Sequence, residues 1–289
     1  MSEEIAIDHL RSWIGKQDRH SDTITAELLK RYQATLSAYT DLSQELPAQL
    51  PLGIHWCLAQ PAISAEGLGA DGHPAKGGFM PPVPLPRRMW AASSVRFHHS
   101  PAIDVAIERT STITDVVLKH SAQSGPLVFV HVDHLYRQDN RTVIEDRQTI
   151  VYRQLAAYQA APAQAMPRAA HAITVTPDNI LLFRYSGITF NSHRIHYDQH
   201  YTTTEEGYPG LVVQGPMMAS MLMNLAQASR PKEPLRRFEF RGLAPAFVDQ
   251  DLRLAVIDKG TEDECSLDIR NNNGALIQSA SARFTADGQ

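Results

Sequence analysis

Cysteine is scarce in this sequence, with only Cys57 and Cys265 among 289 residues. The two lie far apart and lack the paired spacing of metal ligands, so neither a disulfide framework nor a zinc site is indicated. Motifs for binding phosphate, dinucleotides or metal ions are absent as well. We therefore expect no metal ion and no cofactor that the protein keeps for its own use.

An excess of basic residues is also missing, since 27 lysines and arginines stand against 31 acidic residues, for a net charge of -4. A nucleic-acid-binding protein would be expected to carry a clustered basic excess, so we set that class aside. No hydrophobic run approaches the roughly 20 residues of a membrane-spanning helix. The acidic start, residues 1–8, lacks the basic segment and apolar run of a secretory signal. The sequence thus predicts a cytoplasmic protein without nucleic-acid or membrane partners.

Hydrophobic residues make up 43% of the chain, enough to fill the cores of two ordinary domains. In the first half, apolar residues recur at helical spacing over residues 22–45, and Pro47 would end this helix. Residues 67–86 are rich in glycine and proline and predict a long ordered loop. A histidine, a lysine and two adjacent arginines in or near it favour a functional role only mildly. Alternation with a period of two then predicts antiparallel strands over residues 102–119, 127–136 and 142–153.

Residues 156–170, rich in alanine, glutamine and proline, lie between two patterned halves and predict a linker. We divide the chain into a first domain, 1–155, this linker, and a second domain, 171–289. A helix followed by antiparallel strands, twice over, is the pattern that a sheet wrapped around a helix requires. The sequence therefore predicts an α+β protein. In the second domain a short strand, a loop and a helix precede strands over residues 237–241, 252–259, 265–270 and 275–284.

Chemically useful side chains gather in one stretch near the middle of the chain, residues 185–198. Asn191, His193, His196 and Asp198 all lie within it. Imidazole can take or give a proton near neutral pH, because its unperturbed pKa is about 6.5. The stretch therefore offers the groups that a small acid–base site needs.

A helix is predicted to begin soon after this stretch, with Gly215 and Pro216 at its start and apolar residues at helical spacing through about Ala226. Backbone N–H groups in the first turn of a helix have no partner within it, and the positive end of the helix dipole lies there. The N–H of Gly215 can thus receive a developing oxyanion, and a thioester carbonyl would suit it. The alternative, a plain helix start, is compatible with that role.

Three segments of the chain resemble the hot-dog-fold hydratases and dehydratases of the MaoC-like type: residues 84–90, 182–198 and 241–247. The family signature reads, loosely, Ser-Gly-Asp-x-Asn-x-x-His-x-Asp. Aligned on His196, Ser186, Gly187 and Asp198 fall near the expected places, with about one residue of slack before the histidine. The more specific resemblance is to the double-hot-dog subgroup that contains mesaconyl-C4-CoA and itaconyl-CoA hydratases and the type 2 hydroxyacyl-thioester dehydratases.

This resemblance implies a double hot-dog fold, in which two antiparallel sheets each wrap around a central helix. It also implies a division of labour between the two domains. The first, of the FAS1-like dehydratase type, would bind the substrate, and the second, of the MaoC-like type, would be catalytic. The substrate would be an acyl-CoA, so CoA arrives as part of the substrate, and a homodimer is possible.

Two residues depart from the family pattern, in which an aspartate lies five positions before the histidine. Asn191 stands at that position and cannot transfer a proton, so the acid–base role shifts to His196 and Asn191 is expected to hold the water. Gln214 stands where the family often has a histidine, and its carboxamide can donate a hydrogen bond but does not titrate near neutral pH. Asp198 either replaces the missing aspartate, or orients an imidazole, or caps the next structural element.

Four further side chains are candidates for binding substrate. His193 is either part of the site or a hydrogen-bonded loop histidine. The planar guanidinium groups of Arg87 and Arg88 suit a carboxylate or a CoA phosphate, although adjacent arginines are often a solvated pair on a loop. Arg194 has the same two interpretations, and its position beside the motif slightly favours function.

Together these features predict a hydro-lyase that reversibly hydrates an α,β-unsaturated acyl-CoA. The resemblance implies that the substrate is a short dicarboxylic one, with itaconyl-CoA or mesaconyl-C4-CoA converted to citramalyl-CoA. One alternative is dehydration of 3-hydroxyacyl thioesters in fatty-acid metabolism. Another is a protein that binds acyl-CoA without catalysis, which the loss of the aspartate at Asn191 keeps open.

Overall fold

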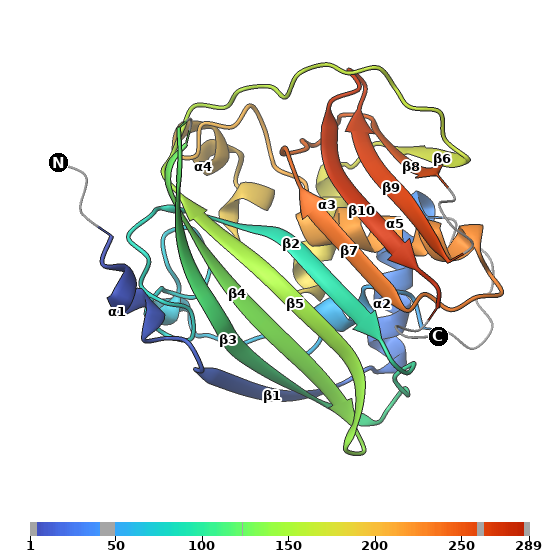
Figure 1. Ribbon diagram of the computed structural model, residues 1–289, viewed down its shortest axis with the longest axis horizontal. Coiled ribbons are helices and arrows are strands. Elements are labelled where there is room, and N and C mark those ends of the chain that lie inside the picture. Colours follow the sequence, from blue (N-terminus) through green and yellow to red (C-terminus); the bar gives the residue numbers. More distant parts are fainter. Residues whose placement is uncertain (1–4, 41–49, 123, 259–262, 286–289) are drawn as a thin grey trace.

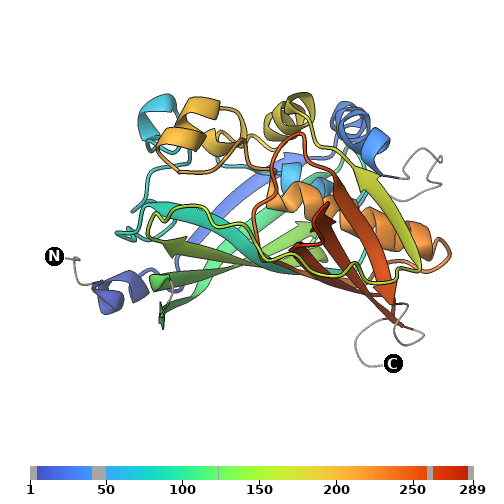
Figure 2. The same cartoon turned by 90° about the horizontal axis from the view of Figure 1, so that it is seen from above.

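The computed structural model describes residues 5–40, 50–122, 124–258 and 263–285 (Figure 1). In this part of the chain ten strands form one antiparallel sheet, and the helices other than the first lie against one of its faces (Figure 2). The strands are β1 (Gln17–Thr23), β2 (Arg87–Phe97), β3 (Ala106–Ser121), β4 (Gly125–Gln138), β5 (Arg141–Arg153), β6 (His171–Val175), β7 (Arg237–Gly242), β8 (Leu252–Asp258), β9 (Glu264–Asn271) and β10 (Leu276–Arg283). The α-helices are α1 (Ile7–Arg11), α2 (Ala26–Leu36), α3 (Asn179–Ile188), α4 (Gln199–Thr204) and α5 (Gly215–Ser229). Short 3₁₀ helices are η1 (Ser37–Tyr39), η2 (Ile54–Cys57), η3 (Ala65–Gly67) and η4 (Arg194–His196).

The sheet is continuous across both halves of the chain, in the order β1-β3-β4-β5-β2-β7-β10-β9-β8-β6. The expectation of two separate sheets is therefore wrong, because residues 92–96 of β2 pair with residues 237–241 of β7 and join the halves edge to edge. The second half still repeats the strand order of the first, since 6-8-9-10-7 corresponds to 1-3-4-5-2. The repeat is thus one of architecture, as the two alternating patterns in the sequence indicate.

Helix α5 is the central helix of the second half and packs against β2 and β7 to β10. Every residue from Met217 to Ala226 is buried, because the helix is apolar on all sides rather than along one stripe. It begins at Gly215, as predicted, and Pro216 stands in the first turn, where its missing N–H removes no helical hydrogen bond. The first residue of α5 lies close to the backbone of Trp90 in β2, which places the start of the helix where the halves meet.

The helix of the first half is shorter than predicted. Residues 17–23 pair with β3 as strand β1, so α2 begins only at Ala26. Thr25 caps it by accepting a hydrogen bond from a backbone N–H of the first turn. Leu42 and Pro47, which belong to the prediction, lie outside the described residues. Helix α2 packs beside α3 in the helical layer, and both contribute to the main core.

The predicted loop at residues 67–86 is confirmed, since it holds no helix or named strand after η3 ends. Gly72 in this loop has a φ of +86°, and a Cβ there would lie 2.0 Å from the carbonyl oxygen of Ser192. Only glycine allows this close approach, which presses the loop of the first half against the second half. Residues 156–170 also lack regular structure, as expected of a connecting segment.

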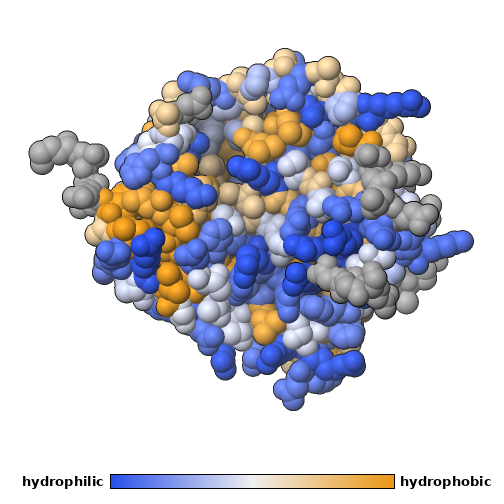
Figure 3. Space-filling view, viewed as in Figure 1, coloured by the Kyte–Doolittle hydropathy of each residue, from blue (hydrophilic) through white to orange (hydrophobic). Residues whose placement is uncertain are grey.

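The face of the sheet turned away from the helices is seen in Figure 3. Hydrophobic residues gather there on the side of α1, and polar residues cover most of the remainder. Within the described part of the chain, none of the helices has the length and apolar character needed to cross a membrane.

Candidate active site

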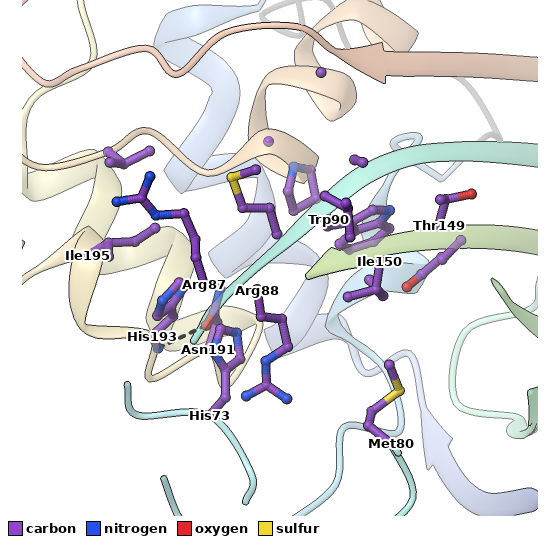
Figure 4. A pocket seen from close by; sticks show the side chains of 18 of the residues that line it. His73, Met80, Arg87, Arg88, Trp90, Thr149, Ile150, Asn191, His193 and Ile195 are labelled. Atoms are coloured by element: carbon purple, nitrogen blue, oxygen red, sulfur yellow. Dashed lines mark hydrogen bonds between the residues drawn. The ribbon is translucent and has the colours of Figure 1, made fainter. Parts of the chain in front are cut away.

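A cavity of about 2340 Å³ is lined by residues from both halves of the chain. Its walls include the loop residues 72–80, strand β2, residues 185–193 and the first turn of α5 (Figure 4). This space exceeds the roughly 300–1,000 Å³ of common small-molecule pockets because its lining continues over both faces of the sheet, from Phe129 and His131 to His134 and Tyr136. The predicted acid–base stretch and the predicted oxyanion site thus open onto the same space.

The first part of the motif-bearing stretch is helical rather than a loop, because it belongs to α3, which begins at Asn179. The chain reverses at Phe190, whose φ is 49°. Asn191 then holds the turn: its N–H donates to the carbonyl oxygen of Ser186, and its Oδ1 accepts from the N–H of His193 at 3.0 Å. Its Nδ2 donates to none of the described residues, and Asn191 lines the cavity. Asn191 therefore fixes the backbone and keeps one donor free.

His196 is buried at the cavity wall. Its Nδ1 lies 2.6 Å from the carbonyl oxygen of Val212, so Nδ1 carries the proton and donates it. Nε2 is then the ring atom that can accept a proton. Burial lowers the pKa of His196 to about 4, so the ring is neutral at pH 7. The imidazole therefore has the tautomer and the charge that a general base needs.

Three imidazole rings lie next to one another here. The ring of His193 is 5.4 Å from that of His196 and 4.1 Å from that of His73, between centroids. His73 comes from the loop of the first half, and Figure 4 shows it beside His193. Burial, with the nearby imidazoles, holds the pKa of His193 well below its ordinary value. The site is thus assembled from both halves of the chain.

His73 is the residue that sequence reasoning did not assign to the site. Its Nδ1 lies 3.3 Å from Oδ2 of Asp71, and Oδ1 of Asp71 accepts from the backbone N–H of His73 at 3.0 Å. Arg88 places Nη2 3.3 Å from the same Oδ2. Burial acts to raise the pKa of Asp71, but the hydrogen bonds and charges of His73 and Arg88 outweigh it and lower the pKa to about 2. The only signal in the sequence is an aspartate two residues before a histidine in a glycine-rich loop.

Asp71, His73 and His193 also offer three ligand atoms that lie within 4.8 Å of one another. Transition metals take such nitrogen and oxygen ligands. The guanidinium of Arg88 is held against Asp71, however, and its charge opposes a second cation at this point. The cluster is therefore better suited to proton transfer than to holding a metal ion.

The first turn of α5 faces the cavity through Gly215, Pro216 and Met218. The N-cap residue, Gln214, makes no side-chain capping bond. Among the described residues the N–H of Gly215 has no hydrogen-bond acceptor. The free donor and the helix dipole together favour negative charge at this end of the cavity.

Asp198 and Arg194 do not line the cavity, contrary to the roles expected for them. Asp198 caps α4 by accepting a hydrogen bond from the N–H of Tyr201 at 3.0 Å, and it pairs with Arg194 at 2.7 Å. Of the alternatives for Asp198, the structure supports the cap. The guanidinium of Arg194 lies over the Tyr201 ring, 4.1 Å from its centroid.

Gln214 is also outside the cavity, and its side chain is fully buried. Its Nε2 donates to the carbonyl oxygen of Leu182 at 2.9 Å and to Oγ of Ser186 at 3.0 Å. These bonds join the start of α5 to α3, and the substrate-binding role expected for Gln214 stays a prediction.

The two adjacent arginines of β2 point to opposite sides, because successive side chains alternate along a strand. Arg87 pairs with Glu206 at 2.8 Å, both are buried, and the guanidinium lies 4.6 Å from the ring centroid of Tyr208. Arg88 instead runs toward His73, as Figure 4 shows. Arg87 therefore has its charge compensated within the protein, whereas Arg88 belongs to the histidine cluster.

Comparison with known proteins now gives the family. Residues 53–248 match the family model of hydroxyacyl-thioester dehydratase type 2. The chain belongs to this family. Among its relatives, "Mesaconyl-C(4)-CoA hydratase" of Chloroflexus aurantiacus is 40% identical over 276 residues, which cover 94% of this chain and 97% of that protein. As a member of the hydroxyacyl-thioester dehydratase type 2 family, the protein is a hydro-lyase of the MaoC-like class.

Solved structures agree with the family at the level of the fold. A MaoC-like dehydratase from Phytophthora capsici superposes with a TM-score of 0.70 over 98% of this chain and 99% of that one, at 13% identity. A Mycobacterium tuberculosis protein described as having a double hot-dog fold gives a TM-score of 0.55 over 93% and 96% of the two chains, at 11% identity. The double hot-dog architecture expected from the sequence is therefore present, with its two halves joined into one sheet.

Proposed function

We propose that this protein reversibly hydrates mesaconyl-C4-CoA, or a closely related short dicarboxylic enoyl-CoA such as itaconyl-CoA, to citramalyl-CoA. The relative from Chloroflexus aurantiacus, at 40% identity over nearly the whole of both chains, supports this substrate class. The supporting observation in the structure is the position of Arg88 beside the histidine cluster. In mesaconyl-C4-CoA the second carboxylate is attached to the β-carbon, where water adds. A cation beside the histidines, such as Arg88, can therefore bind the second carboxylate while water adds to the β-carbon.

Arg88 has hydrogen-bonding capacity left for such a carboxylate. Its side chain is 9% exposed, its Nε is buried without a partner, and Nη2 contacts Asp71 and the carbonyl oxygen of Pro74, each at 3.3 Å. A guanidinium carries five N–H donors, so others can face a ligand in the cavity. Arginine also matches a carboxylate in two parallel hydrogen bonds, which fixes its orientation.

The reaction follows from three groups that open onto the cavity. The N–H of Gly215 polarises the thioester carbonyl and stabilises the enolate-like oxygen, a type of contribution worth roughly 3 kcal/mol elsewhere. The free Nδ2 of Asn191 donates a hydrogen bond to the oxygen of the attacking water. Nε2 of His196 accepts a proton from that water as the oxygen bonds to the β-carbon. General-base assistance of this kind contributes roughly 10²–10⁴-fold.

The test is a comparison of four thioesters under one set of conditions: mesaconyl-C4-CoA, itaconyl-CoA, crotonyl-CoA and a medium-chain enoyl-CoA. The loss of enoyl-thioester absorbance measures hydration of the three conjugated substrates, and chromatography of the citramalyl-CoA formed measures it for itaconyl-CoA, whose double bond is not conjugated with the thioester. We expect kcat/KM to be highest for the dicarboxylic substrates. Equal or higher values for crotonyl-CoA would refute the substrate assignment while leaving the hydro-lyase activity in place.

The second candidate is dehydration of 3-hydroxyacyl thioesters in fatty-acid metabolism, which the family description favours. Preference for the medium-chain substrate in the same assay would select this function. Tight binding of all four thioesters without turnover would instead indicate a binding protein that has lost catalysis.

Three expectations from the sequence stay predictions. One is the division of the chain into a substrate-binding first domain and a catalytic second domain, and the others are a homodimer and a cytoplasmic location. Because His73 and Arg88 come from the first half, we propose that this half contributes to catalysis as well as to binding. The mass of the protein in solution, measured by light scattering, tests the dimer.

A further inference from the structure

We propose that His73, held by Asp71, is the group that delivers the proton to the α-carbon. Asn191 stands in place of the aspartate of the family pattern and cannot transfer a proton. The proposal rests on the proposed function, because it concerns the second half of the same hydration. It assigns a catalytic residue to the first half of the chain.

Hydration of an enoyl thioester requires two proton transfers. One proton leaves the attacking water, and one must reach the α-carbon when the enolate collapses. His196 can serve the first transfer, but it starts neutral and has no proton on Nε2 to give. Asn191 cannot transfer a proton at all. A second titratable group is therefore needed at the cavity wall.

His73 satisfies the geometric requirement. It lines the cavity, its ring lies against that of His193 at 4.1 Å, and its Nε2 has no hydrogen-bond partner among the described residues. Its backbone is fixed because the neighbouring Gly72 is pressed against Ser192 of the second half, whose Oγ donates to the carbonyl oxygen of Gly72. The free ring nitrogen thus belongs to a side chain at the cavity wall, on a loop that these contacts hold against the second half.

Asp71 provides the chemical reason for choosing His73 among the three histidines. Within the row of rings, only His73 has a carboxylate against its Nδ1, at 3.3 Å, whereas the corresponding atom of His196 meets a neutral carbonyl oxygen. A carboxylate stabilises the protonated imidazole, and an acid must start protonated. His73 is therefore suited to be the acid, and His196 to be the base.

The other charges around His73 link its protonation to substrate binding. Burial and the cation of Arg88 together lower the pKa of His73 below its ordinary value, although Asp71 acts to raise it, so the neutral ring predominates at pH 7 before substrate binds. Lys76 is occupied elsewhere, since its Nζ donates to the carbonyl oxygens of Val83 and Leu85. A substrate carboxylate on Arg88 would offset the charge of that arginine. Protonated His73 would then be favoured once a dicarboxylic substrate is bound.

Protons and bonds balance in the resulting step. An O–H bond of water breaks, its proton goes to Nε2 of His196, and the oxygen bonds to the β-carbon. The electron pair of the double bond moves onto the thioester, and the α-carbon then takes the Nε2 proton of His73. The enzyme is left with a protonated His196 and a neutral His73. Transfer of one proton past His193, or exchange with solvent, restores the starting state.

The experiment compares the wild type with His73→Gln and Asp71→Asn on mesaconyl-C4-CoA and crotonyl-CoA. The matched control is His98→Gln, because Nε2 of His98 also faces a carboxylate, Glu145 at 3.5 Å, but the residue is exposed and outside the cavity. Binding of the saturated analogue of each thioester is measured in parallel by calorimetry. Thermal unfolding reports whether each variant is folded.

We expect His73→Gln to lower kcat by roughly 10²–10⁴-fold with little change in the affinity for the saturated analogue. The hydration rate of the wild type should fall as the pH rises through the pKa of His73 in the substrate complex, because the ring then loses its proton. That fall should be absent in His73→Gln and should begin at lower pH in Asp71→Asn. In the wild type, kcat should be lower for crotonyl-CoA than for mesaconyl-C4-CoA, in addition to any difference in KM, because crotonyl-CoA has no carboxylate to bind Arg88.

A folded His73→Gln variant that keeps kcat within about tenfold of the wild type and keeps the fall in rate with rising pH would overturn the proposal. A wild type that prefers crotonyl-CoA would refute the dicarboxylic substrate alone, since His73 can then still be tested on crotonyl-CoA. A wild type without activity on any thioester would refute the proposed function and this proposal together.

Discussion

Two aspartate–arginine pairs lie near the site, and they differ in whether they contact residues of the cavity. Asp198 and Arg194 lie inside the sequence motif, four residues apart, with an Nη2–Oδ2 distance of 2.7 Å. Asp71 and Arg88 lie outside it in the first half of the chain, with a longer distance of 3.3 Å. The shorter pair caps a helix outside the cavity, and the longer one holds His73 at the cavity wall. Membership of a motif and strength of contact therefore do not tell which pair serves the chemistry.

The difference arises from the path of the chain around η4. His193 and His196 are buried on its inner side, whereas Arg194 and Asp198 are partly exposed on the other side. One turn of chain thus presents two sets of side chains to two environments. Substitutions on each side of η4 test whether His193 and His196, together with His73 from the first half, carry out catalysis.

The largest effect is expected for His196→Gln. Glutamine keeps a similar size but removes the base, so kcat/KM for the preferred thioester should fall by roughly 10²–10⁴-fold. Steady-state kinetics measure it, with thermal unfolding as the control for folding. An unchanged rate in the folded variant would show that His196 is not catalytic and that burial on the inner side of η4 does not identify the residues that serve the reaction.

Acid should destabilise the protein through its buried histidines. Burial lowers the pKa of His55 to about 3, of His134 to about 3 and of His196 to about 4, each below the ordinary 6.5. Below pH 6.5 these histidines are protonated in the unfolded chain but stay neutral in the folded protein. The free energy of unfolding therefore falls from about pH 6.5 toward pH 4. At about pH 5.5 the loss is about 1.4 kcal/mol for each histidine, or about 4 kcal/mol in all.

Denaturant unfolding at a series of pH values measures this loss. The His134→Asn variant removes one of these groups and should reduce the loss at pH 5.5 by about 1.4 kcal/mol. A stability that stays constant between pH 6.5 and 5 would contradict the neutral, buried state of these rings. It would also weaken the assignment of His196 as a base that is neutral at pH 7.

Glu206→Gln should be costly to stability because it leaves the buried cation of Arg87 without its anion. Breaking a buried ion pair on one side costs about 3–5 kcal/mol. Chemical denaturation measures the change, and Arg87→Met together with Glu206→Gln should recover much of the loss. If Glu206→Gln is instead as stable as the wild type and binds dicarboxylic thioesters more weakly, Arg87 is the substrate arginine and the choice of Arg88 is wrong.

Arg88→Gln should act on substrate choice. Loss of a hydrogen bond to a charged group costs about 1.5–3 kcal/mol, so kcat/KM for mesaconyl-C4-CoA should fall about 10–100-fold more than for crotonyl-CoA. The ratio of the two values is the measurement, since general damage to the site lowers both. An unaltered ratio would separate the Asp71–Arg88 pair from substrate selection.

Asp198→Ala should have the smallest effect. Loss of an N-cap aspartate costs about 1 kcal/mol of stability, while kcat and KM should remain at wild-type values because the residue is outside the cavity. Asp198→Asn, which preserves the cap, is the matched control and should restore the stability. A loss of activity in a folded Asp198→Ala variant would show that the Asp198–Arg194 pair matters to catalysis although it lies outside the cavity.

Much of this protein could be read from local patterns. Alternation with a period of two located β3, β4 and β5, and the apolar run after Gly215 located α5, because burial of a strand face or of a whole helix constrains nearby residues directly. The signature around His196 gave the family, since the acid–base and helix-start groups lie close together in the chain. The residues of the first half that we propose to act on substrate could not be read in this way.

What the tertiary structure alone decided depends on contacts between distant parts of the chain. Strand β2 pairs with β7 across more than a hundred residues, so whether the halves form two sheets or one is set by an edge that no local pattern describes. His73 reaches His193 only because the loop of the first half is pressed against Ser192 through Gly72. Sequence patterns record how each residue meets its neighbours along the chain, and the proton-transfer cluster is built from residues that meet only when the chain has folded.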